Sequence, residues 1–441
     1  MTQRTSARRL GAVAAAATLG LSLTSCASGS SSAGSGACAS EDGPLAVGHL
    51  NYYTGAFADV GPFFEGIVDL FAEEVINADP PLGREWEVVH DDIGTVGEAS
   101  VARNFLQREQ VDILLNPAHE YGSYREFMLQ QQEQNDGPLM PSVHGGSIEA
   151  AIGGTADEPL FRGSPMDTAQ AVAAVLQAQE EGAQTIAVVA TQIAGSQLQK
   201  DAAVAAAEEL GMDVVEVLDV QPEQPSYRST ISTLESADPD ALMLFSQAED
   251  GGTMVKQAAE AGLSLYIVGS SEWLQESFPR AATMGAIEQH QAVLTAATTQ
   301  VEGPAFDFLK PLWESSEYAE LGDAQNSYVL QYYDLMVTTA LAIEQAGSAC
   351  ASDWTEAMYE VSGDGGTKVS TYEEGIAAIR DGEDIDYEGV TGSYDYTETG
   401  IVSGTFGAYE WASETELELV NSLDGGEVAE IDEVVTRELA E

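Results

Sequence analysis

Apolar segments of strand length alternate with amphipathic segments of helix length from about residue 45 to residue 282. The segment LAVGHLNYY (45–53) has the pattern of a buried strand, and residues 61–78 carry apolar side chains at helical spacing. The same unit recurs around VDILLNP, TIAVVAT and ALMLFSQ. Parallel strands need a crossover between them, usually a helix, so this alternation predicts an α/β fold with parallel sheets covered by helices on both faces.

The later part of the chain departs from this alternation. Residues 304–380 are expected to be mostly helical, and the long apolar helix of 324–347 is expected to end at Gly347. Residues 392–411 alternate aromatic and polar side chains around a Glu-Thr-Gly turn, which predicts a β-hairpin. So long a stretch of α/β sequence exceeds one hydrophobic core, and two domains are expected.

The charge balance is strongly acidic. The 441 residues include 73 Asp and Glu against 16 Lys and Arg, a net charge of −57. Phosphates would be repelled, so nucleic acid is excluded as a partner. A hydrophobic share of 44% argues against disorder. The acidic residues are distributed along the whole chain rather than concentrated in one segment, which is typical of proteins from salt-rich environments.

The N-terminus has the features of a secretory signal. Arg4, Arg8 and Arg9 precede an apolar run too short to span a bilayer. The following LTSC (23–26) resembles the bacterial lipobox, which implies that residues 1–25 are removed and that Cys26 is lipidated. The alternative is an ordinary cleaved signal with an incidental cysteine. Residues 26–42 are rich in Gly, Ser and Ala and are expected to form a flexible tether.

Two further cysteines remain. If Cys26 is acylated, Cys38 and Cys350 are left in an oxidising compartment and are expected to form a disulfide, with two free thiols as the alternative. Outside the signal there is no apolar run of about 18 residues that could span a bilayer.

Short motifs along the body carry a family resemblance. In order they are TGAFADVG, EVVHDD, LLNPAHEYGS, MPSVHGGS, LFRGSPMD, KQAAEAGL, the Tyr-Asp of QYYDLMV, and GVTGSYDYTETG. Their order and spacing resemble type I periplasmic binding proteins of the branched-chain amino acid and amide kind, the receptors of ABC importers. The resemblance covers about residues 44–412 and implies two Rossmann-like lobes joined by three hinge crossings.

The resemblance also implies domain boundaries. The N-terminal lobe is expected to comprise 43–162 and 293–388, and the C-terminal lobe 163–292 and 389–415, followed by an acidic tail of 416–441. The crossings are expected near 161–165, 288–296 and 388–392.

Ligand is expected beyond the carboxyl ends of the strands, where parallel sheets place their sites. The candidate ligand-binding residues are Tyr53, Phe57, Asn116, His119, Glu120, Tyr121, His144, Gly145, Gly146, Ser147, Ala194, Gln247, Glu272 and Trp273.

The resemblance assigns roles to some of these candidates. It implies that Ser147 and the amides of Gly145 and Gly146 bind a carboxylate and that Glu272 binds the ammonium of the ligand. Trp273, beside Glu272, is expected to stack on the ligand. Where the family has Gly-Pro-x-x-Ser and Tyr-Gly, this chain has Asn116 to Glu120 and Ala194-Gly195.

Other kinds of site have weaker support. A metal held by His119 and His144 fits no fixed motif, and the calcium-loop spacing of Asp384 to Asp395 lacks the final Glu. No G-x-S-x-G, P-loop or H-E-x-x-H motif is present, so neither an enzyme nor a cofactor is expected.

The sequence therefore predicts an extracytoplasmic solute receptor, lipid-anchored to the cell membrane. Its expected partners are a small polar ligand and an ABC transporter permease. A sensing module for a signalling partner, or less strongly a lipid-anchored hydrolase, is the alternative.

The acidic surface predicts stabilisation by salt, because salt screens the repulsion between carboxylates. We expect the melting temperature to rise between low and molar salt. A melting temperature that stays constant or falls over this range would contradict a salt-adapted surface.

Overall fold

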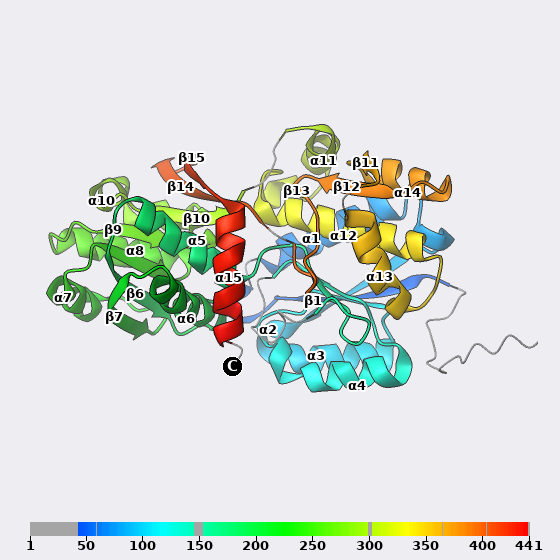
Figure 1. Cartoon of the computed structure of the whole chain (residues 1–441), viewed down its shortest axis with the longest axis horizontal. Coiled ribbons are helices and arrows are strands. Elements are labelled where there is room, and N and C mark those ends of the chain that lie inside the picture. The colour runs from blue at the N-terminus through cyan, green and yellow to red at the C-terminus, as the bar shows by residue number, and fades with distance from the viewer. Residues whose placement is uncertain are drawn as a thin grey trace, which may run out of the picture. The chain divides into compact units, whose positions relative to one another are not determined.

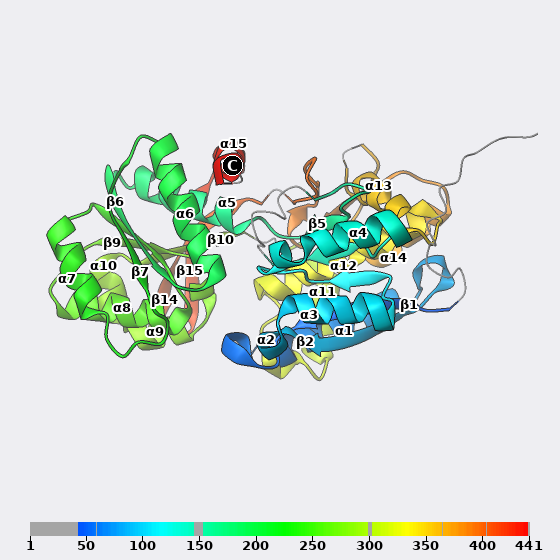
Figure 2. The ribbon, with the colours of Figure 1, turned by 90° about the horizontal axis from the view of Figure 1, so that it is seen from below.

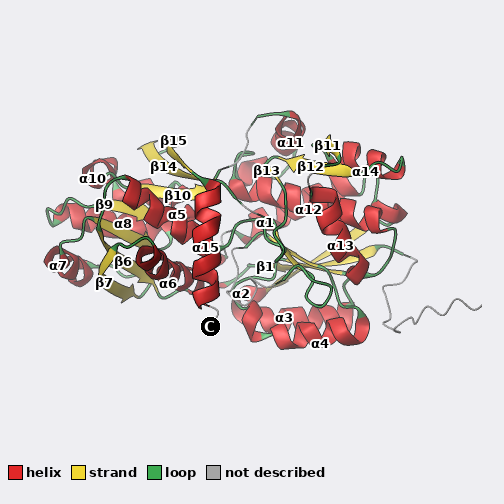
Figure 3. Cartoon of the chain, in the orientation of Figure 1, coloured by secondary structure: helices red, strands yellow, loops and turns green. Residues whose placement is uncertain are grey.

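The computed structural model describes residues 43–58, 60–144, 153–298, 302–363, 365–402 and 404–439. These residues form two bodies, each with its own sheet and its own hydrophobic cores (Figures 1 and 3). Within the described ranges, no helix combines the length and apolar character needed to cross a bilayer.

The first body is built from both halves of the chain. Its N-terminal elements are β1 (Leu45–Asn51), α1 (Gly61–Phe71), β2 (Trp86–Asp92), α2 (Ile93–Val96), α3 (Glu98–Asn104), β3 (Ile113–Leu115), α4 (Arg125–Asn135), β4 (Met140–Ser142) and β5 (Leu160–Arg162). Its later elements are α11 (Pro304–Ser315), α12 (Ser327–Ala346), α13 (Ala351–Ser362), β11 (Thr367–Val369), α14 (Tyr372–Arg380), β12 (Ile385–Gly389) and β13 (Gly392–Ser393).

The main strands of the first body are all parallel. Strands β2, β1 and β3 pair in that order, and β4 pairs with β5. A parallel bridge between Ile113 and Leu139 connects the two groups, so the order is β2-β1-β3-β4-β5. Every strand therefore ends at the same edge of the sheet.

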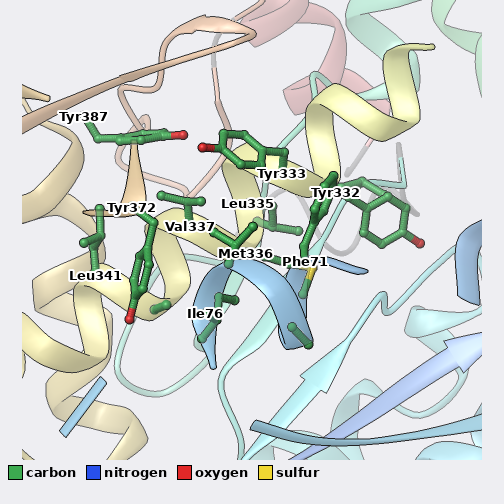
Figure 4. Packing of buried hydrophobic residues seen from close by; sticks show 14 of the residues in the cluster. Phe71, Ile76, Tyr332, Tyr333, Leu335, Met336, Val337, Leu341, Tyr372 and Tyr387 are labelled. Atoms are coloured by element: carbon green, nitrogen blue, oxygen red, sulfur yellow. The ribbon is translucent and has the colours of Figure 1, made fainter. Parts of the chain in front are cut away.

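Alternating side chains of these strands enter two different cores. In β3, Ile113 and Leu115 join the core beneath α1 and α12, whereas Leu114 joins the core with α3 and α4. Figure 4 shows the first of these cores, where Tyr332 and Tyr333 of α12 pack with apolar neighbours. As predicted, this long helix ends at Gly347, which adopts a left-handed conformation.

The second body contains a seven-stranded sheet of order β15-β14-β10-β9-β8-β6-β7. Its strands are β6 (Thr185–Thr191), β7 (Asp213–Val220), β8 (Ala241–Phe245), β9 (Tyr266–Gly269), β10 (Val293–Ala297), β14 (Phe406–Ser413) and β15 (Glu416–Leu423). Its helices are α5 (Asp167–Glu180), α6 (Ala194–Glu209), α7 (Arg228–Ala237), α8 (Ala248–Glu260), α9 (Ser277–Ala282), α10 (Met284–His290) and α15 (Gly425–Leu439).

Helices cover both faces of this sheet, with α6 and α8 on opposite sides (Figure 2). In β6, Ile186 and Val188 face the core of α5, α6 and α15, while Ala187 and Val189 face the core of α7 to α10. Strands β6 to β10 are parallel, β14 pairs antiparallel with β10, and β15 pairs antiparallel with β14 at the edge of the sheet. The predicted α/β architecture is therefore present in both bodies.

The prediction of an acidic tail over 416–441 is wrong for the residues that the structure describes, which are 416–439. Residues 416–423 form the edge strand β15, and α15 buries Val428, Ile431 and Val435 against the second body. The buried side chains lie three and four residues apart, which is the helical spacing, but the surrounding acids concealed this stripe.

The second and third crossings differ from the sequence expectation. Residues 293–297 form β10, inside the second sheet, rather than entering the first body. Val390, Tyr394 and Val402 belong to the core of the first body, so the chain leaves that body only after residue 402. The expected lobe ranges 293–388 and 389–415 therefore begin too early, because the chain enters the first body after residue 297 and leaves it after residue 402.

A buried carboxylate explains why residues beyond 388 stay in the first body. Asp334 on α12 accepts hydrogen bonds from the Tyr387 hydroxyl (2.9 Å), the Val390 amide (3.0 Å) and the Thr391 amide (2.7 Å). Hydrogen bonds to a buried charged group are among the stronger ones in proteins. They fasten the end of β12 to the long helix.

The predicted hairpin of 392–411 is only partly present. The Glu-Thr-Gly turn closes one antiparallel bridge, between Tyr396 and Val402. The long hairpin is instead β14 with β15. Cys350, at the N-cap of α13, is disulfide-bonded, and its expected partner Cys38 lies outside the described residues, as does the expected anchor Cys26.

Candidate functional site

Residues just beyond three parallel strands of the first body come together at one edge. Tyr52 follows β1, Asn116 follows β3, and His144 follows β4. The ring centroids of Tyr52 and His144 are 6.0 Å apart, and Asn116 Oδ1 accepts a hydrogen bond from the Val143 amide at 3.2 Å. These residues lie close together because parallel strands have their carboxyl ends at the same edge of the sheet.

An aromatic group lies at this edge, and its members are Tyr52, Phe57, Phe64, His144 and Tyr328. Phe64 comes from α1 and Tyr328 from α12, with ring centroids 4.9 Å apart. Phe57 lies 5.2 Å from Tyr52, and Phe64 lies 5.9 Å from His144. Tyr52, Phe57 and Tyr328 are partly exposed, so the group offers flat apolar surface to a ligand.

Glu272 of the second body lies within electrostatic range of two rings of this aromatic group. Burial, followed by the charges of nearby acids that include Glu272, raises the pKa of Tyr52. Burial and then Glu272 raise the pKa of Tyr328 in the same way. Glu272 follows β9 and remains partly exposed. A side chain from one body thus acts on two rings of the other.

The protonation of Glu272 responds to its crowded surroundings. Burial, and next the charge of Asp167, raise the pKa of Glu272 to about 7, while His119 opposes the shift. Near neutral pH this carboxyl therefore exists in both forms. A cationic group of a ligand would favour the ionised form.

A second contact between the bodies lies beside Glu272. His119 Nδ1, after β3, is 3.7 Å from Asp167 Oδ2, at the start of α5. A Cβ atom on Gly195 would lie 3.2 Å from His119 Cε1 and 3.3 Å from Asp167 Oδ2. Glycine at this position therefore allows the N-terminus of α6 to approach both side chains closely.

Arg162, at the end of β5, is buried behind His144. Its Nη1 donates to the His144 carbonyl oxygen. Burial lowers the pKa of His144 to about 3, with smaller contributions from His119 and Arg162, so the His144 ring is neutral at physiological pH.

Two of the expected ligand residues of the first body have structural partners instead. The hydroxyl of Tyr53 donates to Glu65, because successive residues of an extended segment point to opposite sides and Tyr52 takes the inward position. Asn116 is fully buried at a positive φ of 68° and donates to His49 Nε2 at 3.1 Å. Its role is to join strand ends beneath the aromatic group.

Glu120 and Tyr121 hold the loop after β3. Glu98 accepts from the Ala118 amide at 2.7 Å and the Glu120 amide at 3.2 Å, while Glu120 Oε2 accepts from the Glu98 amide. The Tyr121 hydroxyl donates to Glu158 at 2.8 Å and the side chain is buried. This loop positions His119, and Glu120 and Tyr121 are engaged with the first body.

In the second body the expectation for Trp273 is wrong. Trp273 is fully buried, stacks on Phe278 at 4.2 Å and donates to Ser246, so it belongs to the core rather than to a ligand surface. Gln247 is partly exposed and accepts from Thr191 at 3.3 Å, and Ala194 is exposed at the start of α6. Gly145, Gly146 and Ser147 lie outside the described residues.

The metal alternatives gain no support. In the described part of the chain, no group of three or more His, Cys, Asp and Glu side chains is arranged to hold a metal. The segment with calcium-loop spacing folds into the β12–β13 hairpin, where Lys368 pairs with Glu388 and lies 3.8 Å from Asp386.

Several residues of the candidate site were not predicted from the sequence. Tyr328 lies one helical turn before Tyr332, and Phe64 lies beside the apolar stripe of α1, so both were hidden among core residues. Asp167 and Arg162 both lie within LFRGSPMD, a motif whose pattern alone indicates no site.

Comparisons with known proteins agree with this architecture. The family model described as Periplasmic binding protein matches residues 44–381. No curated protein matches the chain in sequence.

Solved structures share the fold at low sequence identity. A leucine-binding protein from Thermotoga maritima has a TM-score of 0.67 at 16% identity, covering 87% of this chain and 99% of its own. A benzoate-bound ABC transporter solute-binding protein from R. palustris has a TM-score of 0.65 at 15% identity, with 86% and 96% covered. A fatty acid ABC transporter substrate-binding protein from Thermomonospora curvata has a TM-score of 0.65 at 15% identity, with 90% and 95% covered. The predicted type I periplasmic binding protein fold is confirmed.

The raised pKa of Glu272 predicts how its substitution responds to pH. The folded state keeps a proton on Glu272 up to about pH 7, whereas the unfolded state releases it near 4.5, so stability falls as pH rises through this window. Glu272→Gln removes this loss. We expect the variant to melt roughly 2–4 °C above the parent at about pH 8 and level with it at about pH 4.

The matched control is Glu288→Gln, an exposed position on α10. Its melting temperature should follow the parent at both pH values. A Glu272→Gln difference that is the same at both pH values would contradict the assigned shift.

Proposed function

The chain belongs to the periplasmic binding protein family, and from this premise we propose a lipid-anchored solute receptor that passes a small polar molecule to an ABC importer. Members of this family work outside the cytoplasm and bind solutes without acting as enzymes, and the same holds for this chain. We propose as ligand an amino acid, an amide or a related compound held between the two bodies.

Two observations carry this proposal: His119 of the first body lies 3.7 Å from Asp167 of the second, and Glu272 of the second body acts electrostatically on Tyr52 and Tyr328 of the first. Tyr52 and Tyr328 belong to the first body and Glu272 to the second, and all three are partly exposed. A ligand in contact with both sides binds the closed arrangement better than the open one. It therefore shifts the population toward closure, which the importer can recognise.

The chemistry of these residues suits a molecule with a flat or apolar part and a polar end. The aromatic group would hold the apolar part, and Glu272 with Asp167 would attract an amine. Structural neighbours named for leucine, benzoate and fatty acid ligands are consistent with such a range.

The lipid anchor is the second component of the proposal. Cys26 follows a signal-like segment and precedes a Gly/Ser/Ala tether. Several acyl chains on one cysteine hold a protein stably, since each buried methylene contributes about 0.8 kcal/mol. The tether would keep the receptor close to its permease.

A ligand screen tests the receptor function. Melting temperatures of the full chain in molar salt would be recorded with amino acids, short amides, urea, polyols and aromatic acids. A ligand at a hundredfold excess over its Kd stabilises the native state by about 2.7 kcal/mol, so one chemical class should raise the melting temperature. No shift with any class, for a folded protein, would contradict a solute receptor.

The anchor is tested separately by Cys26→Ala in secreting cells. The parent chain should remain with the membrane fraction and the variant should appear in the medium, because it lacks the acylated side chain. A Ser22→Ala variant serves as control and should stay with the membrane. Equal release of parent and Cys26→Ala would contradict lipidation.

A further inference from the structure

Two histidine rings on neighbouring strands meet at hydrogen-bond distance inside the first body. His49 on β1 pairs in register with His90 on β2, and their Nδ1 atoms lie 2.7 Å apart. His49 is fully buried, whereas His90 is partly exposed and its Nε2 lies 2.9 Å from Asp69 Oδ1 on α1. On the other side, Asn116 Nδ2 donates to His49 Nε2 at 3.1 Å. The proposed receptor function assigns no role to this pair of rings.

The two ends of this chain of hydrogen bonds fix its direction. The Val143 amide is a backbone N–H, which can only donate, and it lies 3.2 Å from Asn116 Oδ1. Because Oδ1 is the acceptor, Nδ2 of Asn116 is the group that donates to His49. At the other end, the ionised carboxylate of Asp69 can only accept. Every bond between these ends therefore runs from Val143 toward Asp69.

This direction assigns the tautomers of both histidines. His49 accepts at Nε2, so its proton is on Nδ1, from which it donates to His90 Nδ1. His90 then carries its own proton on Nε2 and donates to Asp69. Tyr332 fits this assignment, because its hydroxyl accepts from Asn116 and lies 3.4 Å from His49 Nε2. Two neutral rings thus have a partner for every ring nitrogen.

The surroundings direct an added proton to His90 rather than to His49. Burial, followed by the charges of His90 and His144, lowers the pKa of His49 well below its ordinary value. His90 is partly exposed to water and lies beside the Asp69 carboxylate, which favours an imidazolium. The ring that takes up a proton is therefore the one nearer the surface.

The other acids near His90 have different partners or point away from it. Along α1 and the turn that continues it, Glu65 accepts from a tyrosine hydroxyl and Glu73 is exposed. On β2, Asp91 points to the opposite face of the strand, and Asp92 accepts from backbone amides that follow β1. The carboxylate on α1 that bonds His90 is therefore the charge that acts on it directly.

A second proton on His90 cannot enter this chain of hydrogen bonds without reversing part of it. The imidazolium has N–H groups on both ring nitrogens, so its Nδ1–H faces the Nδ1–H of His49. The contact survives only if His49 accepts at Nδ1 and carries its proton on Nε2 instead. That N–H then meets the Nδ2 donor of Asn116, and two donors cannot form a hydrogen bond. One proton from water is taken up in total.

We propose that His49 and His90 form a proton-operated switch that acts on the strand ends of the site. In the neutral state Asn116 holds the Val143 amide, and Val143 directly precedes His144, whose ring belongs to the aromatic group. Protonation of His90 displaces the Asn116 side chain and releases that amide. Mild acid therefore loosens the segment that presents His144 to the site. This switch goes beyond the proposed receptor function and lies in the first body alone, so its test needs no known solute.

Nitrogen NMR of the full chain, labelled at its histidine nitrogens, tests the switch directly. The chain contains 5 histidines, so each ring can be assigned by substitution. At neutral pH we expect the proton of His49 on Nδ1 and that of His90 on Nε2. Between about pH 7.5 and about pH 5, where an ordinary histidine titrates, His90 should gain its second proton and His49 should change to the Nε2–H tautomer at the same midpoint.

Three results of this titration would overturn the proposal. The first is a His49 that already carries its proton on Nε2 at neutral pH. The second is a His49 that stays unchanged while His90 becomes doubly protonated. The third is a His90 that remains neutral down to about pH 5, since the switch would then not operate in the range of an ordinary histidine.

A charge variant tests whether the two rings act together. Asp69→Asn keeps an acceptor for His90 but removes the charge that favours its imidazolium, so both NMR changes should move together to lower pH. The matched control is Glu73→Gln, an exposed acid one helical turn further along, which should leave both changes close to those of the parent. Midpoints of His49 and His90 that separate in Asp69→Asn would contradict a coupled pair.

Hydrogen exchange tests the link from the histidines to the site. After correction for the intrinsic exchange rate, the Val143 amide should exchange several-fold faster in mild acid than at neutral pH, because it loses its acceptor. His90→Gln cannot take up the proton and should show no such increase. An equal increase in both proteins, or none in the parent, would overturn the action on the site. If His90→Gln does not fold, Asp69→Asn replaces it, with the increase expected at lower pH.

Discussion

The parallel pairing of strands is the constraint on which the site depends. In the first body, β2, β1, β3, β4 and β5 all run in one direction, so their carboxyl ends share one edge. Tyr52 and His144 meet there although about ninety residues separate them in sequence. Strands β6, β8 and β9 of the second body obey the same rule, which places Glu272 at the end of β9. One topological rule, applied twice, supplies both halves of the site.

The sequence predicted the architecture well because hydrophobic periodicity reports directly on burial. Strand β6 and helix α12 follow from their apolar patterns alone. The boundaries between the bodies depend instead on long-range contacts, such as the hydrogen bonds from Tyr387 and Thr391 to Asp334. A local pattern contains no information about which distant carboxylate a turn will meet. The high acid content also concealed the buried stripe of α15.

The candidate site was predictable by region but not by side chain. His119, His144 and Glu272 follow strands at the expected places, and the structure brings their surroundings together. Trp273 was expected to stack on ligand, but local sequence could not show that Phe278 would take that face. The contacts of Arg162 could not be predicted from local sequence, because they depend on how the fold places β5 beside the residues that follow β4.

The central claim is that a single ligand contacts both bodies. A crystal structure with the first ligand found by screening tests it most directly. The account predicts ligand atoms within about 4 Å of Tyr52 or Tyr328 and, in the same molecule, of Glu272. A ligand that touches only one body, or that lies away from the aromatic group, would contradict the account.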